Sequence, residues 1–524
     1  MKLKKSSKII SVLLGAMVVL SACAANKTSD KTTKATVKSN TFTYGIDGDP
    51  GNSVNVVTTS DRYGLMEIKA LYSPLYMYNA DKIVYFLAES MTPSSDYLSY
   101  TAKLRKNVKW SDGQPFTADD VVFTYEQMLK ESNAGWAYSQ LIFDGKPVKV
   151  EKLDDYTVKF TLPSPSIPAI ELLGNIFIMP KHVYDGESNI ENSTKNAAPV
   201  GTGPYKLAEY KAGQYVKFVK NNNYFLGAPK IDNVVFKIIG DANTAQLALQ
   251  KGEIDALAVQ PSDISKLSKD KNLKTIPYNE GRIAYAAFNL NSKAVQDKNV
   301  RQAILYALNR SEIINASFVS ENYAKPAYTF LPNESKYHTD NVEKYATDAN
   351  KSKQLLSKAG VSSVSVKIAY AGNNVPQQKQ AAIMQQELKA VGIDAQLLGL
   401  DSSALYKKLE SKSSDFDIYL GGYIMGIDPD TFNSLFITGN SANYMNYSNK
   451  EIDDLFSQGR VEKDANARKE IYAKIQQKLQ DDAVFYPIAE SKRILAINTS
   501  IEGIEDASLV PVYTFEDMSK LYIK

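Results

Sequence analysis

The sequence predicts an α/β protein, because strands and helices alternate along most of its 524 residues. Residues 100–105 alternate apolar and polar side chains, a turn follows at 110–113, and an amphipathic helix begins after Thr117. A helix at 379–391, between strands at 365–371 and 395–400, repeats this order. Hydrophobic residues make up 44% of the chain, which is enough to bury a large core.

The N-terminus carries the three parts of a bacterial secretion signal. Lysines at positions 2, 4, 5 and 8 precede an apolar run at 9–20, about half the length that a membrane span needs. The next residues, Leu-Ser-Ala-Cys at 20–23, resemble the lipobox of bacterial lipoproteins. That resemblance implies a signal peptide at 1–22 and a diacylglycerol on Cys23, and an ordinary cleaved secretion signal is the alternative.

The mature chain is predicted to be held together by its core, without disulfides, because Cys23 is its only cysteine. Residues 23–40 are nearly all small or polar and predict a flexible, lipidated tether. Formal charge is +3 for the whole chain and −1 from residue 23 onward, after the four leader lysines are removed. This balance gives no basic surface for nucleic acid.

The remaining elements follow in order along the folded body. A glycine-rich turn at 200–205 differs from a dinucleotide-binding loop, because Lys206 stands where the third glycine belongs. A helix at 242–251 ends at Gly252, and another runs from Val300 towards Ile314. Further strands are expected at 41–46, 215–219, 234–239 and 283–290.

The stretch Lys-Trp-Ser-Asp-Gly-Gln-Pro-Phe-Thr-Ala-Asp-Asp-Val at 109–121 resembles the segment that marks family 5 of the extracytoplasmic solute-binding proteins. This family is the peptide and nickel group, and the chain most resembles its Gram-positive oligopeptide-binding lipoproteins. The likeness extends from residue 41 to the C-terminus, and further matching stretches lie at 200–207, 287–289, 300–310 and 427–430. Turn and cap chemistry accounts for the first stretch, so it indicates the family without locating the ligand.

The resemblance implies an α/β, two-lobed fold of the periplasmic-binding-protein type, with a hinge between the lobes and an extra subdomain in the first. By position, the first lobe is expected at 41–77, 166–283 and 490–524, its extra subdomain at 78–165, and the second lobe at 284–489.

Peptide binders of the family hold their ligand as an added strand, and the matching segment here is 417–423. Gly421 and Gly422 would let another backbone come close, although paired glycines can also mark a bulge. Many members place an aspartate four residues before the proline of the next loop, where it pairs with the peptide's α-ammonium. Here that position is Met425, so another group must meet the amine, or the amine must lie in water.

The carboxylates nearest to that role are Asp428 and Asp430 on the same loop, together with three aspartates expected from the facing lobe. The predicted ligand-binding residues are Asp47, Asp49, Asp61, Asn289, Gly421, Gly422, Tyr423, Met425, Asp428 and Asp430.

Catalysis is not expected. Only two histidines, His182 and His338, are present, and neither belongs to a His-Glu-x-x-His pair or lies near a Gly-x-Ser-x-Gly elbow. No phosphate-binding loop is present, so ATP hydrolysis would belong to a partner. Transition metals prefer His and Cys ligands, which the mature chain almost lacks. We therefore expect no cofactor and no site for a free metal ion. Binding of a chelated metal is left as an alternative.

The sequence thus predicts a monomeric binding protein that is lipid-anchored on the extracytoplasmic face of the cell membrane. Its expected ligand is an oligopeptide, and its expected partners are ABC permease subunits with a cytoplasmic ATPase. The alternatives are a receptor for signalling peptides, a surface adhesin on the same fold, and a carrier of chelated, nickel-type metal.

Overall fold

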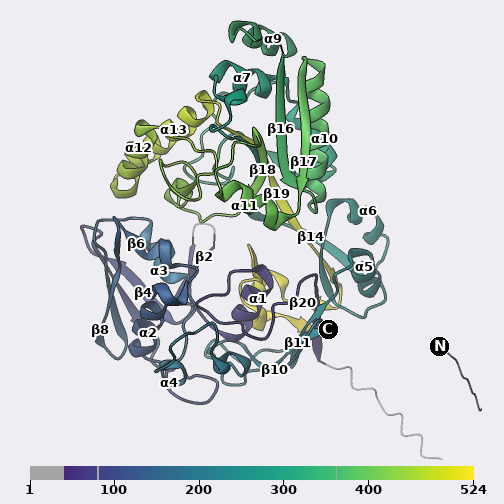
Figure 1. Cartoon of the computed structure of the whole chain (residues 1–524). Helices are drawn as coiled ribbons and strands as arrows, with labels where there is room; N and C mark the ends of the chain where they lie inside the picture. Colours follow the sequence, from purple (N-terminus) through teal and green to yellow (C-terminus); the bar gives the residue numbers. More distant parts are fainter. Residues whose placement is uncertain (1–39, 80–81, 362) are drawn as a thin grey trace, which may run out of the picture. The chain divides into compact units, whose positions relative to one another are not determined.

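One sheet of eleven strands runs through the part of the chain that this computed structural model describes, residues 40–79, 82–361 and 363–524 (Figure 1). The predicted signal peptide, Cys23 and nearly all of the tether lie outside these residues. In spatial order the strands are β10 (Tyr205–Lys211), β11 (Tyr215–Lys220), β12 (Asn233–Ile238), β1 (Thr41–Ile46), β13 (Ala256–Val259), β19 (Phe485–Asn498), β14 (Leu273–Phe288), β18 (Ile418–Tyr423), β16 (Val364–Ala371) and β17 (Ile393–Leu400), and β15 (Ala324–Pro326) pairs with β19 beside this path.

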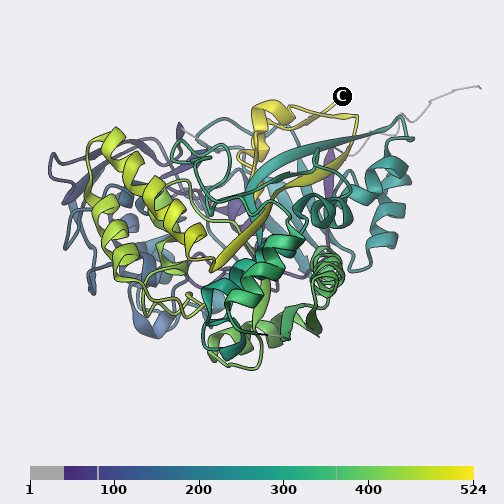
Figure 2. The ribbon, with the colours of Figure 1, turned by 90° about the horizontal axis from the view of Figure 1, so that it is seen from above.

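Strands β14 and β19 connect the two halves of this sheet. They pair antiparallel from Leu273 opposite Asn498 to Ala287 opposite Phe485, and they lie side by side in both views (Figures 1 and 2). The first half of the sheet attaches through β13, which pairs with β19, and the second half through β18, which pairs with β14. These strands are the two segments that cross between the lobes.

The predicted first lobe contains β1, β12 and β13, and a separate four-stranded sheet lies in the stretch predicted as its extra subdomain. That smaller sheet has the order β4 (Ala88–Pro93), β5 (Ser99–Leu104), β9 (Thr157–Thr161), β8 (Lys149–Asp154), and β6 (Ile142–Phe143) pairs with β7 (Lys146–Pro147). The remaining elements are α1 (Arg62–Leu71), α2 (Ala118–Met128), α3 (Ala169–Gly174), α4 (Lys181–Tyr184), α5 (Ala242–Gln250), α6 (Ile264–Leu267), α14 (Ile504–Ala507) and the pairs β2 (Tyr76–Asn79) with β3 (Lys82–Tyr85), β20 (Ile501–Glu502) with β23 (Tyr522–Ile523), and β21 (Leu509–Val510) with β22 (Thr514–Phe515).

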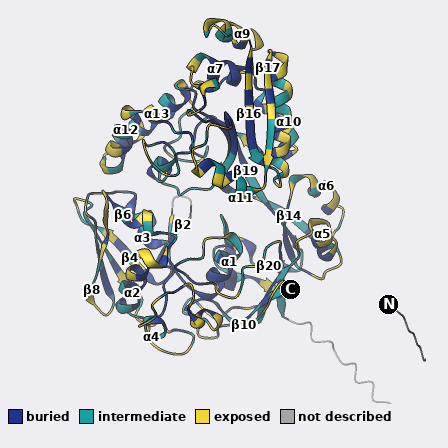
Figure 3. Cartoon of the chain, in the orientation of Figure 1, coloured by how far each residue is buried: buried dark blue, intermediate teal, exposed yellow. Residues whose placement is uncertain are grey.

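The second lobe places helices on both faces of its strands. Ala284 and Ala286 of β14 face one hydrophobic cluster, and Ile283 and Tyr285 face another, because successive strand residues point to opposite sides. In Figure 3 strand β16 is largely buried, whereas exposed residues lie on α9 and α10. The helices are α7 (Lys298–Ala307), α8 (Arg310–Phe318), α9 (Ala349–Lys358), α10 (Val375–Ala390), α11 (Ser402–Glu410), α12 (Lys450–Val461) and α13 (Ala465–Asp481).

The buried apolar residues of the described part form four clusters, and each draws its members from one predicted lobe. Ile283 is the exception: the prediction assigns it to the first lobe, and it packs in a second-lobe cluster. The clusters agree in outline with the predicted domain boundaries, which stay a prediction.

Turn and cap chemistry explains the stretch at 109–121. The Asp120 carboxylate accepts the backbone N–H of Thr117 at 2.9 Å, which closes the start of α2. The indole N–H of Trp110 donates to the same carboxylate at 3.3 Å. A Cβ at Gly201 would lie 1.8 Å from the carbonyl oxygen of Leu71. The turn therefore needs glycine at this position, because it passes close to the end of α1.

Two predicted elements differ from the structure. The helix expected from Val300 towards Ile314 is two helices, because Asn309 leaves the helical conformation and caps α8 by accepting the backbone N–H of Glu312. Strand β14 begins at Leu273, ten residues before the predicted start, since its first half pairs with β19 in the first lobe.

Candidate functional site

Strand β18 has one paired edge and one largely open edge. All six residues of Ile418–Tyr423 pair with β14 on one side. On the other side β16 pairs only with Ile418 and Tyr419. Among the residues that the structure describes, the edge from Leu420 to Tyr423 therefore has no strand partner. Such an edge offers backbone donors and acceptors to a second extended chain.

The two glycines of β18 make room for side chains of β14. A Cβ at Gly421 would lie 2.5 Å from the Cζ atom of Tyr285, and one at Gly422 would lie 2.9 Å from an Nη atom of Arg282. The register between β14 and β18 continues without a shift through both glycines. The alternative that these glycines mark a bulge in β18 is therefore wrong.

The predicted carboxylates of the following loop are already paired with arginines of the second lobe. Asp428 binds Arg468 of α13 through two contacts of 2.7 and 2.8 Å, and the Arg468 side chain is 3% exposed. Asp430 accepts the Nε–H of Arg460 at 3.0 Å. Burial raises the pKa of the Asp430 carboxyl, and Arg460 opposes this rise. Met425, earlier in the loop, is half-buried against the second-lobe core.

The three predicted first-lobe aspartates lie near the ends of β1 and α1. Asp61 caps α1 by accepting the backbone N–H groups of Tyr63 and Gly64, both at 3.0 Å. Asp47 accepts the hydroxyl of Tyr63, so both aspartates contact this one tyrosine. Asp49 is held instead at the turn between β10 and β11, where it accepts the backbone N–H of Gly213 at 2.7 Å.

Two other predicted site residues turn their side chains into the second-lobe core. The amide of Asn289 is fully buried and donates to the carbonyl oxygens of Ser413 and Phe416 at 2.7 and 2.9 Å. The hydroxyl of Tyr423 donates to the carbonyl oxygen of Phe330 at 2.7 Å. Both side chains therefore fix the fold around β18, and any contact of Tyr423 with a ligand would use its backbone.

Glu171 of α3 was not among the predicted residues, yet it contacts the same loop from the first lobe. Its carboxylate accepts the backbone N–H groups of Ile427 and Asp428 at 2.6 and 2.7 Å. Burial raises the pKa of Glu171 to about 7, against the lowering effect of these two N–H groups. The sequence carries no signal for this contact, because its partners lie more than 250 positions apart.

Two further hydrogen bonds connect the first-lobe elements to α12 and to the residues that follow it. The backbone N–H of Ile167 donates to the carbonyl oxygen of Arg460 at 3.1 Å. The ammonium of Lys463 donates to the carbonyl oxygen of Ser95 at 2.8 Å. Polar contacts of this kind, without a shared hydrophobic cluster, are typical of surfaces that separate and rejoin.

A family model described as bacterial extracellular solute-binding proteins, family 5 Middle, matches residues 82–445. The chain belongs to this family. Family 5 is a family of solute-binding proteins and not of enzymes. The oligopeptide-binding protein AppA of Bacillus subtilis is 30% identical over 98% of this chain and 99% of its own length.

Solved structures give the same family and confirm its two-lobed α/β fold. The ABC transporter substrate-binding protein CtaP from Listeria monocytogenes is 43% identical, with a TM-score of 0.88 over 93% of this chain and 99% of its own. AppA from Bacillus subtilis in complex with a nonapeptide is 28% identical, with a TM-score of 0.78 over 92% of this chain and 99% of its own.

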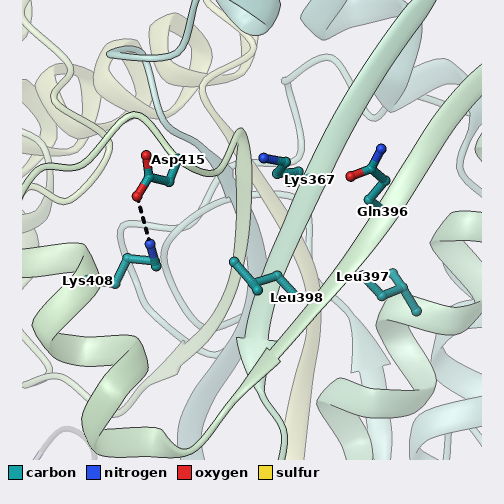
Figure 4. A pocket seen from close by; sticks show the side chains of 6 residues that line it. All are labelled: Lys367, Gln396, Leu397, Leu398, Lys408 and Asp415. Carbon is teal, nitrogen blue, oxygen red and sulfur yellow. Dashed lines mark hydrogen bonds and ion pairs between the residues drawn. The ribbon is translucent and has the colours of Figure 1, made fainter.

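This family 5 protein also has an open pocket of about 370 Å³ on its second lobe (Figure 4). Lys408 and Asp415 form an ion pair of 3.1 Å at one side of it. The full lining is Lys367, Gln396, Leu397, Leu398, Lys408 and Asp415, none of which was predicted to bind the ligand.

Neither a metal centre nor a membrane-spanning helix is found in the described ranges. Within residues 40–79, 82–361 and 363–524, no three His, Cys, Asp or Glu side chains converge as metal ligands would. The helices of the same ranges are all too short or too polar to cross a bilayer.

Proposed function

We propose that this protein captures oligopeptides outside the cell, holds them between its lobes as a strand added to β18, and delivers them to the permease of an ABC importer. The observation that carries the proposal is the open edge of β18 from Leu420 to Tyr423. The family supports binding of an extracellular solute. The names of the relatives support a peptide as that solute.

An added strand explains how one site accepts many sequences. Each residue of an extended peptide carries the same backbone donor and acceptor, and these groups can pair with the open edge of β18. Gly421 and Gly422 present no side chain of their own to the peptide. Affinity then comes from the main chain, whereas side chains affect binding only where they meet a pocket or a charge.

The peptide's α-ammonium is not held by a carboxylate of the loop after β18. Met425 occupies the expected position, and Asp428 and Asp430 are engaged by Arg468 and Arg460. These arginines already neutralise both carboxylates, so neither attracts an ammonium as a free carboxylate would, and separating either pair would cost several kcal/mol. We therefore place the amine in water and regard long peptides, bound through their middle, as the preferred ligands.

Delivery requires the lobes to open and close around the ligand. Glu171, Ile167 and Lys463 contribute the polar contacts that connect the lobes in the closed form. Strands β14 and β19 keep the lobes connected when these contacts open. We infer that the permease, with its ATPase, recognises the closed, loaded form.

Peptide backbone methylation tests the added strand. One nonapeptide that binds is made as a series with a single N-methyl group at each successive position. Because alternate N–H groups of a strand point to opposite sides, every second methyl group should weaken binding by about fivefold to tenfold, as expected for one lost hydrogen bond. The intervening positions are the matched controls. Calorimetry showing equal losses at all positions would overturn the added strand.

The ligand class and the absence of catalysis are tested together. Melting temperatures should rise with peptides and not with nickel chelates, haem or sugars, since a ligand stabilises the state that binds it. Peptides recovered after long incubation should be intact by mass spectrometry. Cleaved peptides would indicate an enzyme, and a melting shift with nickel chelates alone would indicate a metal carrier.

The proposed membrane anchor depends on Cys23, which lies outside the described residues. A C23A substitution should abolish fatty-acid labelling and release the protein from the membrane fraction. A C23S variant is the matched control for size, and it should also lose its label, because a hydroxyl is not a lipobox acceptor. Unchanged labelling of C23A would contradict lipid attachment.

A further inference from the structure

Three arginines and a single glutamate gather where the lobes join. Arg62 comes from the start of α1, Arg282 and Glu280 from β14, and Arg493 from β19. The charges of Glu280, Arg62 and Arg493 all act on Arg282, so the group is one electrostatic cluster. Positive charge is therefore in excess among these four side chains.

The glutamate, Glu280, forms its ion pair with one of the three arginines, Arg62. Glu280 is 4% exposed, and its two oxygens accept from Arg62 at 2.9 and 3.4 Å. Arg62 donates in addition to the carbonyl oxygen of Val512 at 3.3 Å. This two-point pairing engages both oxygens of Glu280, and among the described residues neither oxygen accepts a hydrogen bond from Arg282 or Arg493.

Arg282 has no comparable partner. Within the described ranges no carboxylate or carbonyl oxygen accepts a hydrogen bond from its half-buried guanidinium. A buried Nε of the neighbouring Arg493 is likewise without a hydrogen-bond acceptor. An unpaired guanidinium that has lost much of its water is costly, and an anion placed beside it would remove this cost.

The position of Arg282 connects this charge to the open strand edge. Its guanidinium lies against Gly422, where a Cβ would be 2.9 Å from Nη2 and 3.2 Å from Cζ. Gly422 is the residue before the end of β18. A chain added along Leu420–Tyr423 would therefore pass next to Arg282 as it leaves the strand.

A further acidic group, Asp47, forms its hydrogen bond with Tyr63 and not with Arg282. Asp47 accepts the hydroxyl of Tyr63, and Tyr63 is close enough to Arg493 for their charges to interact. Asp47 thus lies on the Arg493 side of the cluster. The remaining neighbour that acts on Arg282 is Tyr406 of α11, whose side chain carries no carboxylate and which is 51% exposed.

We propose that Arg282 is an anion subsite that binds a carboxylate of the ligand peptide. The inference rests on the proposed function, because it takes the peptide to run along β18. The carboxylate is either the C-terminal group of a peptide that ends at Gly422 or an acidic side chain of a longer peptide. A guanidinium donates two parallel N–H groups to either form.

A competition experiment separates these sources. Immobilised protein is offered random nonapeptides without Asp and Glu, as an equal mixture of free acids and C-terminal amides. A second mixture contains amides only, half of them with one Glu and half with Gln in its place. Mass spectrometry of the retained peptides gives the ratio of charged to neutral forms.

The wild-type protein should retain the charged form in about tenfold excess in at least one mixture, as one charge-assisted pair implies. R282Q should lower this ratio to about one while still retaining neutral peptides, and R282K should keep part of the preference. K408Q, which removes a half-buried positive charge elsewhere in the second lobe, is the matched control and should keep the wild-type ratio.

The outcomes distinguish the two proposals. If the wild-type protein retains no peptide of either kind, the proposed function fails, and this subsite fails with it. If it retains peptides in a ratio near one in both mixtures, the function stands and the subsite is overturned. The same holds if R282Q keeps the wild-type ratio. If R282Q does not fold, a wild-type ratio near one in both mixtures still overturns the subsite, and the partial preference expected of R282K tests whether Arg282 is the group responsible.

Discussion

The carboxylate of Glu171 accepts the backbone N–H of Asp428 at 2.7 Å, which connects α3 to the loop that follows β18. The approach is possible because the residue before Ile427 is Gly426, where a Cβ would lie 2.4 Å from a carboxylate oxygen of Glu171. The contact therefore depends on one buried acid and one missing side chain.

The first prediction concerns pH. Burial raises the pKa of Glu171 to about 7, from 4.5. Between these values the folded protein holds a proton that the unfolded chain has lost, so the free energy of unfolding should fall as pH rises from 4.5 to 7. The full shift corresponds to about 3 kcal/mol. Glu171→Gln cannot titrate and should lack this part of the slope.

Denaturant unfolding of both proteins at pH 5, 6, 7 and 8 measures that difference. The pKa values of Glu67 and Glu387, raised by burial to about 8 and about 7, add slopes of the same sign. Because both proteins carry these residues, their effects cancel in the comparison. If the free energies of unfolding of the two proteins differ by the same amount at every pH, Glu171 has an ordinary pKa.

The second prediction concerns the ion pair of Asp428 and Arg468. Asp428→Asn leaves a nearly buried guanidinium without its carboxylate and should cost about 3–5 kcal/mol of unfolding free energy. Asp454→Asn is the matched control, because Asp454 pairs with Lys450 at 2.7 Å on the exposed surface. It should change stability by less than about 1 kcal/mol. Equal effects in urea titrations would mean that the buried pair is not formed.

The third prediction concerns the ligand's amine. N-acetylation of a bound peptide should weaken binding by less than about fivefold, because Asp428 and Asp430 are held by arginines and the amine lies in water. Calorimetry with the free and acetylated peptide measures the change. A loss above about a hundredfold that disappears in Glu171→Gln would reveal a carboxylate clamp supplied by the first lobe.

The fourth prediction concerns Gly421. An alanine there would meet the ring of Tyr285 at 2.5 Å, so Gly421→Ala should destabilise the fold by about 1–3 kcal/mol. Gly240→Ala is the control, since its nearest neighbour lies 3.9 Å away. It should leave stability unchanged or raise it by up to about 1 kcal/mol. A melting curve of Gly421→Ala that matches the control would contradict the crowding.

Local chemistry made part of the fold predictable. The strand at 41–46 follows from alternation, and the start of α2 follows from Thr117 and its capping partner Asp120. The break at Asn309 also had a local signal that the prediction passed over. Asn309 and Glu312 form a reciprocal pair at the start of α8, with the spacing of a capping box.

Contacts between distant segments were not predictable in the same way. Glu171 and Arg282 are unremarkable in the sequence, because their importance comes from what the fold places beside them. The same applies to Asp428 and Asp430, which the sequence presents as free carboxylates. These residues are brought together by the pairing of strands that lie hundreds of positions apart in the chain. Hydrophobic periodicity is a local pattern and does not reveal such pairing.

The continuous sheet has a consequence for the order of folding during synthesis. Strand β13 of the first lobe pairs with β19, and the first-lobe core includes Phe515 and Leu521 near the C-terminus. The lobe whose chain emerges first therefore lacks part of its core until translation has almost finished. Until then its unpaired strands need protection from aggregation, and a truncation that removes the last thirty or so residues should leave this lobe, rather than the second one, unfolded.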